Sequence, residues 1–209
     1  MIKESIKLNC LAVLWKPPFY FKNLNDEGVI NFYSACLNHI EDKSTLKVIL
    51  YHFPANTCVP ITHHIIDKLY AAYPENILGV KDSLGNFNES LELIRKYPHL
   101  KIYVGNDTDT SELVRHGACG AITAMSNLVP NLMRSLYDYG KDEAKPNRNE
   151  EILKFAAIIV QYYFLSSVKA IMAAQNAPKW LIARPPLVSL TLEQGHELVK
   201  QIKEANINK

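Results

Sequence analysis

Two side chains suited to chemistry stand at the ends of apolar runs. Lys81 ends the run of residues 77–81, and Tyr51 ends the run of residues 47–51. A lysine drawn into an apolar site loses solvation, which favours the neutral amine, and such an amine attacks a carbonyl to form a Schiff base. A tyrosine hydroxyl one strand away can transfer the protons that this chemistry requires. The structural alternatives are a lysine whose ammonium extends into solvent and an aromatic ring that closes a strand end.

The chain has five short runs of this kind, all rich in apolar residues. A run that is apolar throughout is typical of a strand buried on both faces of a parallel sheet. Amphipathic stretches fill the gaps, and regular alternation of strand and helix predicts right-handed βαβ units. Active groups collect at the carboxyl ends of parallel strands, which is where Lys81 and Tyr51 stand. The predicted strands are residues 10–15, 47–51, 77–81, 101–104 and 120–124.

Helical periodicity marks the segments between and after these strands. Thr62 is predicted to cap the helix that follows it, and Gly117 is predicted to stop another. The alternation ends after Ala124, so we predict an α/β region over residues 1–125 and C-terminal helices over residues 126–209. From the pattern alone an open five-stranded α/β sheet is expected. The predicted helices are residues 27–40, 62–73, 86–97, 110–116, 128–139, 150–175 and 192–204.

Size and composition exclude several classes of protein. The 209 residues, 48% hydrophobic and 21% charged, are ordinary for a soluble globular domain. The formal net charge is +2 and no basic stripe stands out, so a nucleic acid is not an expected partner. No apolar run has the length of a membrane span, and the first ten residues lack the features of a signal peptide. We therefore expect no membrane partner and a cytoplasmic location.

The cysteines and histidines do not predict a metal site. The four cysteines lack C-x-x-C spacing, and no set of cysteines and histidines has zinc-finger spacing, so free thiols are expected. His63 and His64 are adjacent, and adjacent residues on a helix point in different directions. No metal is therefore predicted.

Six segments, in matching order, resemble motifs of the dihydrodipicolinate synthase and N-acetylneuraminate lyase family. Residues 51–54 (YHFP) resemble its Y-N-x-P motif, and residues 79–83 (GVKDS) resemble the segment whose lysine forms the Schiff base. Together the six span nearly the whole chain. The other four are residues 18–20 (PFY), 105–107 (GND), 117–123 (GACGAIT) and 184–187 (RPPL).

The resemblance implies a fold and an activity. The family is a (β/α)8 TIM barrel, of which this chain resembles about the last five βα units, the fourth to the eighth, plus a C-terminal helical extension. Its members are class I aldolases or lyases that act on pyruvate or on pyruvate-yielding 2-oxo sugar acids. They need no cofactor, because the protonated imine is the electron sink. They associate as homodimers or homotetramers.

The resemblance also implies roles for particular residues. Lys81 matches the imine-forming lysine, and Tyr51 matches the tyrosine that relays protons. Tyr20 matches a segment from which some members send a tyrosine into a neighbouring subunit's site. Ile122 matches a residue of the last strand whose peptide groups lie beside bound pyruvate.

Two departures from the family pattern leave alternatives open. The family's G-T-T-G-E segment, which holds the pyruvate carboxylate, has no counterpart in this sequence. A truncated chain without activity, or one that completes its sheet by association, is therefore an alternative. Asn56, beside Thr57 in the substrate-binding loop, takes the position of an arginine that binds a substrate carboxylate in dihydrodipicolinate synthases. This disfavours a true dihydrodipicolinate synthase and leaves 2-keto-3-deoxygluconate-type aldolases open.

Overall fold

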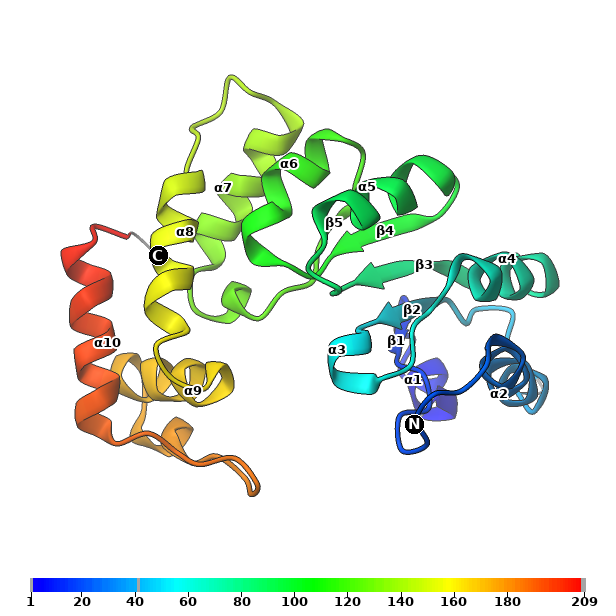
Figure 1. Ribbon diagram of the computed structural model, residues 1–209, viewed down its shortest axis with the longest axis horizontal. Coiled ribbons are helices and arrows are strands. Elements are labelled where there is room, and N and C mark those ends of the chain that lie inside the picture. Colours follow the sequence, from blue (N-terminus) through cyan, green and yellow to red (C-terminus); the bar gives the residue numbers. More distant parts are fainter. Residues whose placement is uncertain (1, 41, 208–209) are drawn as a thin grey trace. The chain divides into compact units, whose positions relative to one another are not determined.

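The computed structural model describes residues 2–40 and 42–207, so positions 1, 41 and 208–209 of the two predicted regions lie outside the described residues. The fold is α/β, with one parallel sheet of five strands (Figure 1). The described chain forms two compact units. Of the described residues, unit 1 comprises 2–40, 42–106 and 116–122, and unit 2 comprises 107–115 and 123–207.

The sheet of unit 1 confirms all five predicted strands and their parallel pairing. Its strand order follows the chain order, β1-β2-β3-β4-β5. Successive right-handed crossovers that always step in the same direction place their helices on one face of a sheet, as in the wall of a barrel. We call the opposite face of the sheet, which these crossover helices do not cover, the free face. The strands are β1 (Val13–Trp15), β2 (Val48–His52), β3 (Ile77–Asp82), β4 (Lys101–Val104) and β5 (Gly120–Ala121).

Three helices of unit 1 begin where the sequence supplies a capping side chain. Thr62 caps as predicted, because its Oγ1 accepts the Ile65 backbone N–H at 3.3 Å. Asn25 and Asn86 accept backbone N–H groups in the same way at the starts of two other helices. The helices are α1 (Ile2–Lys7), α2 (Asp26–Asn38), α3 (Pro54–Thr57), α4 (His63–Ala72) and α5 (Phe87–Lys96).

The two faces of the sheet carry different side chains because successive residues of a strand point to opposite sides. On the helix-covered face, Leu50 and Val80 are fully buried. Trp15, which pairs with Leu50, packs its ring 5.2 Å from the ring of Tyr33 in α2. Residues one position further along point the other way, and these include Tyr51 and Lys81.

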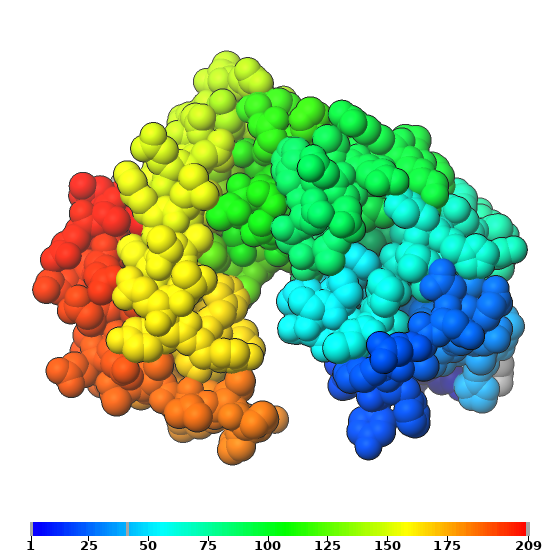
Figure 2. All heavy atoms as spheres, viewed as in Figure 1, coloured from blue at the N-terminus to red at the C-terminus, as the bar shows by residue number. Residues whose placement is uncertain are grey.

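Unit 2 is built from helices around a core of its own. The core is entirely apolar, and α10 packs against both α8 and α9; Figure 2 shows α8, in yellow, beside α10, in red. The helices are α6 (Thr110–Arg115), α7 (Pro130–Lys141), α8 (Asn149–Ile159), α9 (Phe164–Gln175) and α10 (Leu192–Glu204), with short 3-10 turns at Asp107–Asp109, Met125–Asn127 and Pro178–Leu181.

The prediction of one helix over residues 150–175 is wrong. The chain forms α8 and α9, which are bent by 103° relative to each other. Ile158, Ile159 and Val160 are β-branched, and Tyr163 is not helical, with φ of −58° and ψ of 123°. β-Branched and aromatic residues are weak helix formers, so a break in this stretch costs little and lets both helices bury their apolar faces.

Among the described residues, no single helix is long and apolar enough to cross a membrane. The bent pair α8 and α9 passes the same test of length and composition only when the two are taken together.

Candidate active site

Lys81 stands near the carboxyl end of β3, on the face of the sheet that the helices of unit 1 leave free. Its neighbours Val80 and Asp82 point to the helix-covered face, and alternation turns Lys81 the other way. Only 9% of Lys81 is exposed. An amine held in a position with so little water around it is restricted to a few partners, and the nearest of these is aromatic.

Tyr51 is that partner. It pairs directly with Lys81 in the parallel register of β2 and β3. The Lys81 Nζ atom lies 4.1 Å from the centre of the Tyr51 ring. The Tyr51 ring also stacks on Phe53, with the ring centres 5.8 Å apart. The structure therefore brings together the two side chains that the sequence singled out, as nearest neighbours on adjacent strands.

Tyr103 is a neighbour of Lys81 that the sequence reasoning missed. It pairs with Lys81 across β3 and β4, so Lys81 stands between two tyrosines in one row of the sheet. Burial raises the pKa of the Tyr103 phenol, and a hydrogen bond with the Cys119 side chain raises it further. The sequence predicts residues 101–104 as a strand, and this strand contains a tyrosine. Only the register of the sheet identifies which residue of the strand faces Lys81.

The loop after β2 carries Asn56 and Thr57 on the short helix α3. Asn56 is exposed. Thr57 is buried, and its hydroxyl lies 3.0 Å from the carbonyl oxygens of Phe53 and Val59, so this hydroxyl serves the loop itself. Cys58 ends α3 with φ of 54°, a left-handed conformation that glycine adopts more readily than other residues.

Tyr20 lies on the loop after β1, where 83% of its surface is exposed. Its ring packs edge-on against Phe21, with centres 5.3 Å apart. The same loop contacts α3, because the Lys22 Nζ atom lies 3.5 Å from the carbonyl oxygen of Thr57. The structure thus places Tyr20 on a loop at the same end of the sheet as Lys81, with its side chain open to solvent.

Ile122 follows β5 and extends its ladder by one bond. Its backbone N–H donates to the Val104 carbonyl at 2.9 Å, and Val104 pairs with Asp82 in the next strand. The peptide of Ile122 therefore lies at the same edge of the sheet as the end of β3.

Gly105 allows β4 to turn beside the end of β3. A Cβ atom at this position would lie 2.0 Å from the Ser83 Oγ and 2.5 Å from the Asp82 carbonyl oxygen. The two strand ends cannot move apart without breaking a hydrogen bond, because the Gly105 N–H donates to that same carbonyl at 2.7 Å. A glycine is thus required where the two strand ends meet, one residue beyond Lys81.

We expect Gly105→Ala to destabilise the fold by about 1–3 kcal/mol, the usual cost of forcing an extra carbon into a packed site. The change is measured by urea unfolding. Gly28→Ala is the matched control, because the added Cβ there meets only the Asn25 side chain at 3.2 Å. Equal stability of Gly105→Ala and the original chain would contradict the close approach.

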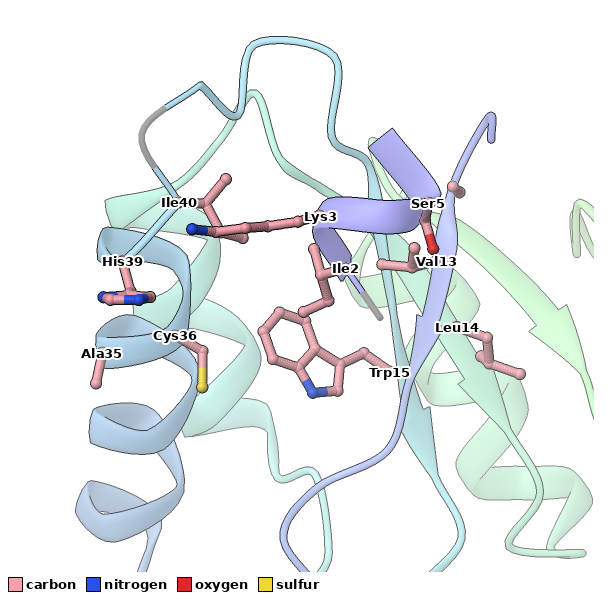
Figure 3. A pocket seen from close by; sticks show the side chains of 11 residues that line it. Ile2, Lys3, Ser5, Val13, Leu14, Trp15, Ala35, Cys36, His39 and Ile40 are labelled. Carbon is pink, nitrogen blue, oxygen red and sulfur yellow. The ribbon is translucent and has the colours of Figure 1, made fainter. Parts of the chain in front are cut away.

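A separate cavity of about 920 Å³ lies at the edge strand β1. Figure 3 shows the Trp15 ring in this cavity, between Ile2 of α1 and Cys36 of α2. Lys81 and Tyr51 are not part of its lining. The described residues also contain no group of three or more histidine, cysteine, aspartate or glutamate side chains that could hold a metal ion.

Comparison with known proteins gives matches to one family over nearly the whole chain. The sequence model of the "Dihydrodipicolinate synthetase family" matches residues 3–205. An uncharacterized DapA-like lyase from Chloroflexus aurantiacus is 38% identical over 136 residues, which are 65% of this chain and 45% of that protein. A 4-hydroxy-tetrahydrodipicolinate synthase from Campylobacter hominis is 27% identical over 94% of this chain and 65% of its own length. The chain thus spans less than two thirds of these relatives.

A solved structure has the same fold. It is the chloride-inhibited dihydrodipicolinate synthase from Acinetobacter baumannii, complexed with pyruvate, which superposes with a TM-score of 0.80 at 26% identity. The match covers 99% of this chain and 70% of the other chain. Because nearly every residue is covered, both the sheet and the C-terminal helices have counterparts in that protein.

Proposed function

Because this chain belongs to the dihydrodipicolinate synthetase family, which it matches over residues 3–205, we propose that Lys81 forms a Schiff base with pyruvate or with a pyruvate-yielding 2-oxo acid. The observation that carries the proposal is the pairing of Lys81 with Tyr51, with Nζ 4.1 Å from the ring. Both side chains lie near the carboxyl ends of their strands, where parallel α/β folds place their chemistry.

The proposed reaction balances without any further reagent. The Lys81 amine adds to the carbonyl carbon, and loss of water leaves an imine. The imine then loses a proton from the neighbouring methyl carbon to give an enamine, and the enamine carbon attacks an aldehyde. Hydrolysis of the new imine releases the product and restores Lys81. In the opposite direction the same carbon–carbon bond breaks, and the protonated imine accepts the electron pair.

Tyr51 supplies the proton transfers in this scheme. Water must leave from a protonated carbinolamine, and each direction of the carbon–carbon step needs a proton moved to or from an oxygen. The Lys81 Nζ atom lies 4.1 Å from the centre of the Tyr51 ring, so the phenol is next to the amine. Ile122 is proposed to offer its peptide groups to the bound 2-oxo acid from the same edge of the sheet.

The test is reductive trapping. The chain is incubated with pyruvate and borohydride, digested, and searched by mass spectrometry for a reduced adduct. We expect one modified peptide, which contains Lys81. A chain that keeps the family motifs but lacks an active site would give no adduct under conditions in which a full-length relative is trapped, and that result would remove the proposed function.

The aldehyde partner depends on the groups around α3. Asn56 carries no charge, which favours a neutral sugar-acid product over one with a second carboxylate. A true dihydrodipicolinate synthase is the second candidate, and Lys22 is the observation that favours it. Its Nζ lies 3.5 Å from the carbonyl of Thr57, the residue after Asn56 in the sequence. A lysine can bind a carboxylate as a point charge, although without the two-pronged geometry of arginine.

Aldehydes with and without a carboxylate distinguish the two candidates. Under the favoured assignment, pyruvate condenses faster with a neutral sugar aldehyde such as glyceraldehyde, and Lys22→Met changes this rate little. Faster condensation with a carboxylate-bearing aldehyde, lost in Lys22→Met, would establish the second candidate. Product formation is followed by chromatography of the 2-oxo acid.

The association of subunits is proposed from the aromatic residues of the loop after β1. Phe19, Tyr20 and Phe21 are 45%, 83% and 69% exposed. Burial of such rings against a second copy of the chain would stabilise a homodimer or homotetramer. Light scattering coupled to size-exclusion chromatography measures the mass, and Tyr20→Ser together with Phe21→Ser is expected to shift it toward the monomer.

A further inference from the structure

His52 follows Tyr51 and points to the opposite face of the sheet. It is 8% exposed, and its Nδ1 atom accepts the backbone N–H of Ile61 at 2.9 Å. A nitrogen that accepts a hydrogen bond carries no proton, so the imidazole is the neutral tautomer with its proton on Nε2. His52 therefore bonds to the chain nine residues further on.

This hydrogen bond closes the loop of residues 53–60. The loop contains α3, with Asn56 and Thr57, and returns to the sheet just before α4 begins. Ile61 is 3% exposed, so without His52 its N–H would lose its partner in a buried position. An unsatisfied buried donor costs about 1–3 kcal/mol. This hydrogen bond thus fixes both ends of the loop from the helix-covered face of the sheet.

Asp82 completes the same arrangement on β3. It pairs directly with His52 in the register, and the Ser83 N–H donates to the His52 carbonyl at 2.8 Å. The Asp82 carboxylate accepts the Leu84 N–H at 3.0 Å and the hydroxyl of Ser90 in α5. One residue earlier on each strand stand Tyr51 and Lys81. The ends of both strands are therefore fixed on the helix-covered face, while their reactive side chains lie on the free face.

We propose that His52 is a positioning residue, which sets the place of Tyr51 and of the loop over residues 53–60 through its bond to the Ile61 N–H. The residue does not touch the reacting atoms. The proposal goes beyond the proposed function, and only its rate measurement rests on that function.

The bond makes the position of Tyr51 sensitive to pH. Protonation of Nδ1 would turn the acceptor into a donor that faces the Ile61 N–H. Burial lowers the pKa of His52 below its ordinary value of 6.5, while the charges of Asp82 and Glu89 partly oppose that effect. A cavity of about 350 Å³ beside the ring brings three elements around it, with Asp82 from β3, His63 from α4, and Glu89 and Glu92 from α5.

The sign of the linkage follows from the lowered pKa. Between the folded and the unfolded pKa of His52, the unfolded chain binds more protons, so the contribution of His52 to stability rises with pH. That contribution is complete well above pH 6.5 and is lost progressively as the pH falls below it.

Three substitutions distinguish the role of the His52 Nδ1 atom from that of Nε2. His52→Asn places an oxygen one bond from Cγ, as Nδ1 is, so it keeps the acceptor for Ile61 and never titrates. His52→Gln places its polar atoms further out, near the position of Nε2. His52→Leu keeps a branched shape with no acceptor. Amide hydrogen exchange, corrected for the intrinsic rate, measures the protection of the Ile61 N–H. We expect this N–H to be protected in the original chain and in His52→Asn but not in the other two variants.

Two readouts then report on Tyr51. The chemical shift of the Lys81 ε-methylene reports the Tyr51 ring above it without any substrate. The rate of deuterium uptake into the pyruvate methyl group reports the enamine. We expect His52→Gln and His52→Leu to lose the ring-current shift and to lower kcat by about 10- to 100-fold with a smaller change in KM, since small misplacements at a reacting centre have effects of this size. His52→Asn is expected to retain both, and to abolish the loss of Ile61 protection below pH 6.5.

Equal Ile61 protection in all four proteins would overturn the proposal, as would equal Lys81 shifts in His52→Asn and His52→Gln. If the original chain takes up no deuterium, the proposed function fails, while exchange and chemical shifts still decide the role of His52. If His52→Leu does not fold, the comparison of His52→Asn with His52→Gln decides it alone.

Discussion

Replacing Lys81 by methionine is expected to abolish the reduced pyruvate adduct entirely. The adduct requires a primary amine at the carbonyl, and Lys81 is the amine that the sheet holds on its free face, 9% exposed and 4.1 Å from the Tyr51 ring. Methionine has a similar length and no nucleophilic nitrogen. Mass spectrometry after incubation with pyruvate and borohydride measures the result directly.

The same substitution is not expected to unfold the chain. Lys81 has little exposed surface, so its amine is poorly solvated there. Methionine needs no such solvation and adapts to irregular space. We expect the free energy of unfolding to stay within about 1 kcal/mol of the original or to rise. An absent adduct in Lys81→Met would therefore report chemistry and not misfolding.

Lys101→Met is the matched control. Lys101 begins β4 in the same sheet, but it is exposed and stands at the opposite end of its strand. This variant should be trapped by pyruvate as efficiently as the original chain. An adduct that persists in Lys81→Met, or that disappears in Lys101→Met instead, would mean that another amine reacts with pyruvate. That result would contradict the assignment.

The predictable part of the fold is the part that local pattern determines. Each apolar run became a strand, and Thr62 caps α4 as its sequence position indicates. The helix over residues 150–175 was overextended because periodicity continues across the break. Only the packing of α8 and α9 against the same core decides that the chain turns at residues 160–163.

The register of the sheet could not be predicted from the sequence. It depends on an irregularity in the pairing of β2 with β3 between Val48 and Ile49, and on the close approach at Gly79, where a Cβ atom would lie 1.9 Å from the Lys101 carbonyl oxygen. A shift of one residue would turn every side chain to the other face. Tyr51 and Lys81 can be identified from the sequence because each ends an apolar run. Tyr103 can be identified as a neighbour of Lys81 only once the register of the sheet is known.

Two residues that are adjacent in sequence at the end of β2 have different proposed roles because they lie on opposite faces of the sheet. His52 and Tyr51 are adjacent in sequence, and the alternation of strand side chains predicts that they point opposite ways. His52 accordingly contacts Ile61 on the helix-covered face. The identity of its partner could not be predicted, since it depends on how the loop of residues 53–60 returns to the sheet.

Tyr51→Phe is expected to lower the rate of deuterium uptake into the pyruvate methyl group by about 10²- to 10⁴-fold, the usual contribution of a positioned acid–base group. Phenylalanine keeps the ring that contacts Lys81 and stacks on Phe53, and it removes only the hydroxyl. The amine therefore stays in place, and reductive trapping at Lys81 persists, more slowly. Proton nuclear magnetic resonance in heavy water follows the uptake without knowledge of the aldehyde partner.

Tyr103→Phe is the control that makes this result specific. Tyr103 pairs with Lys81 from the other side, so it matches Tyr51 in residue type and in position within the row. Burial, with a smaller effect of the Cys119 side chain, raises the pKa of its phenol, which makes it a weaker proton donor to a bound imine. We expect this variant to lose little of the uptake rate. Equal losses in the two variants would show that Lys81 lies between two interchangeable tyrosines, and a larger loss in Tyr103→Phe would transfer the proton-relay role to β4.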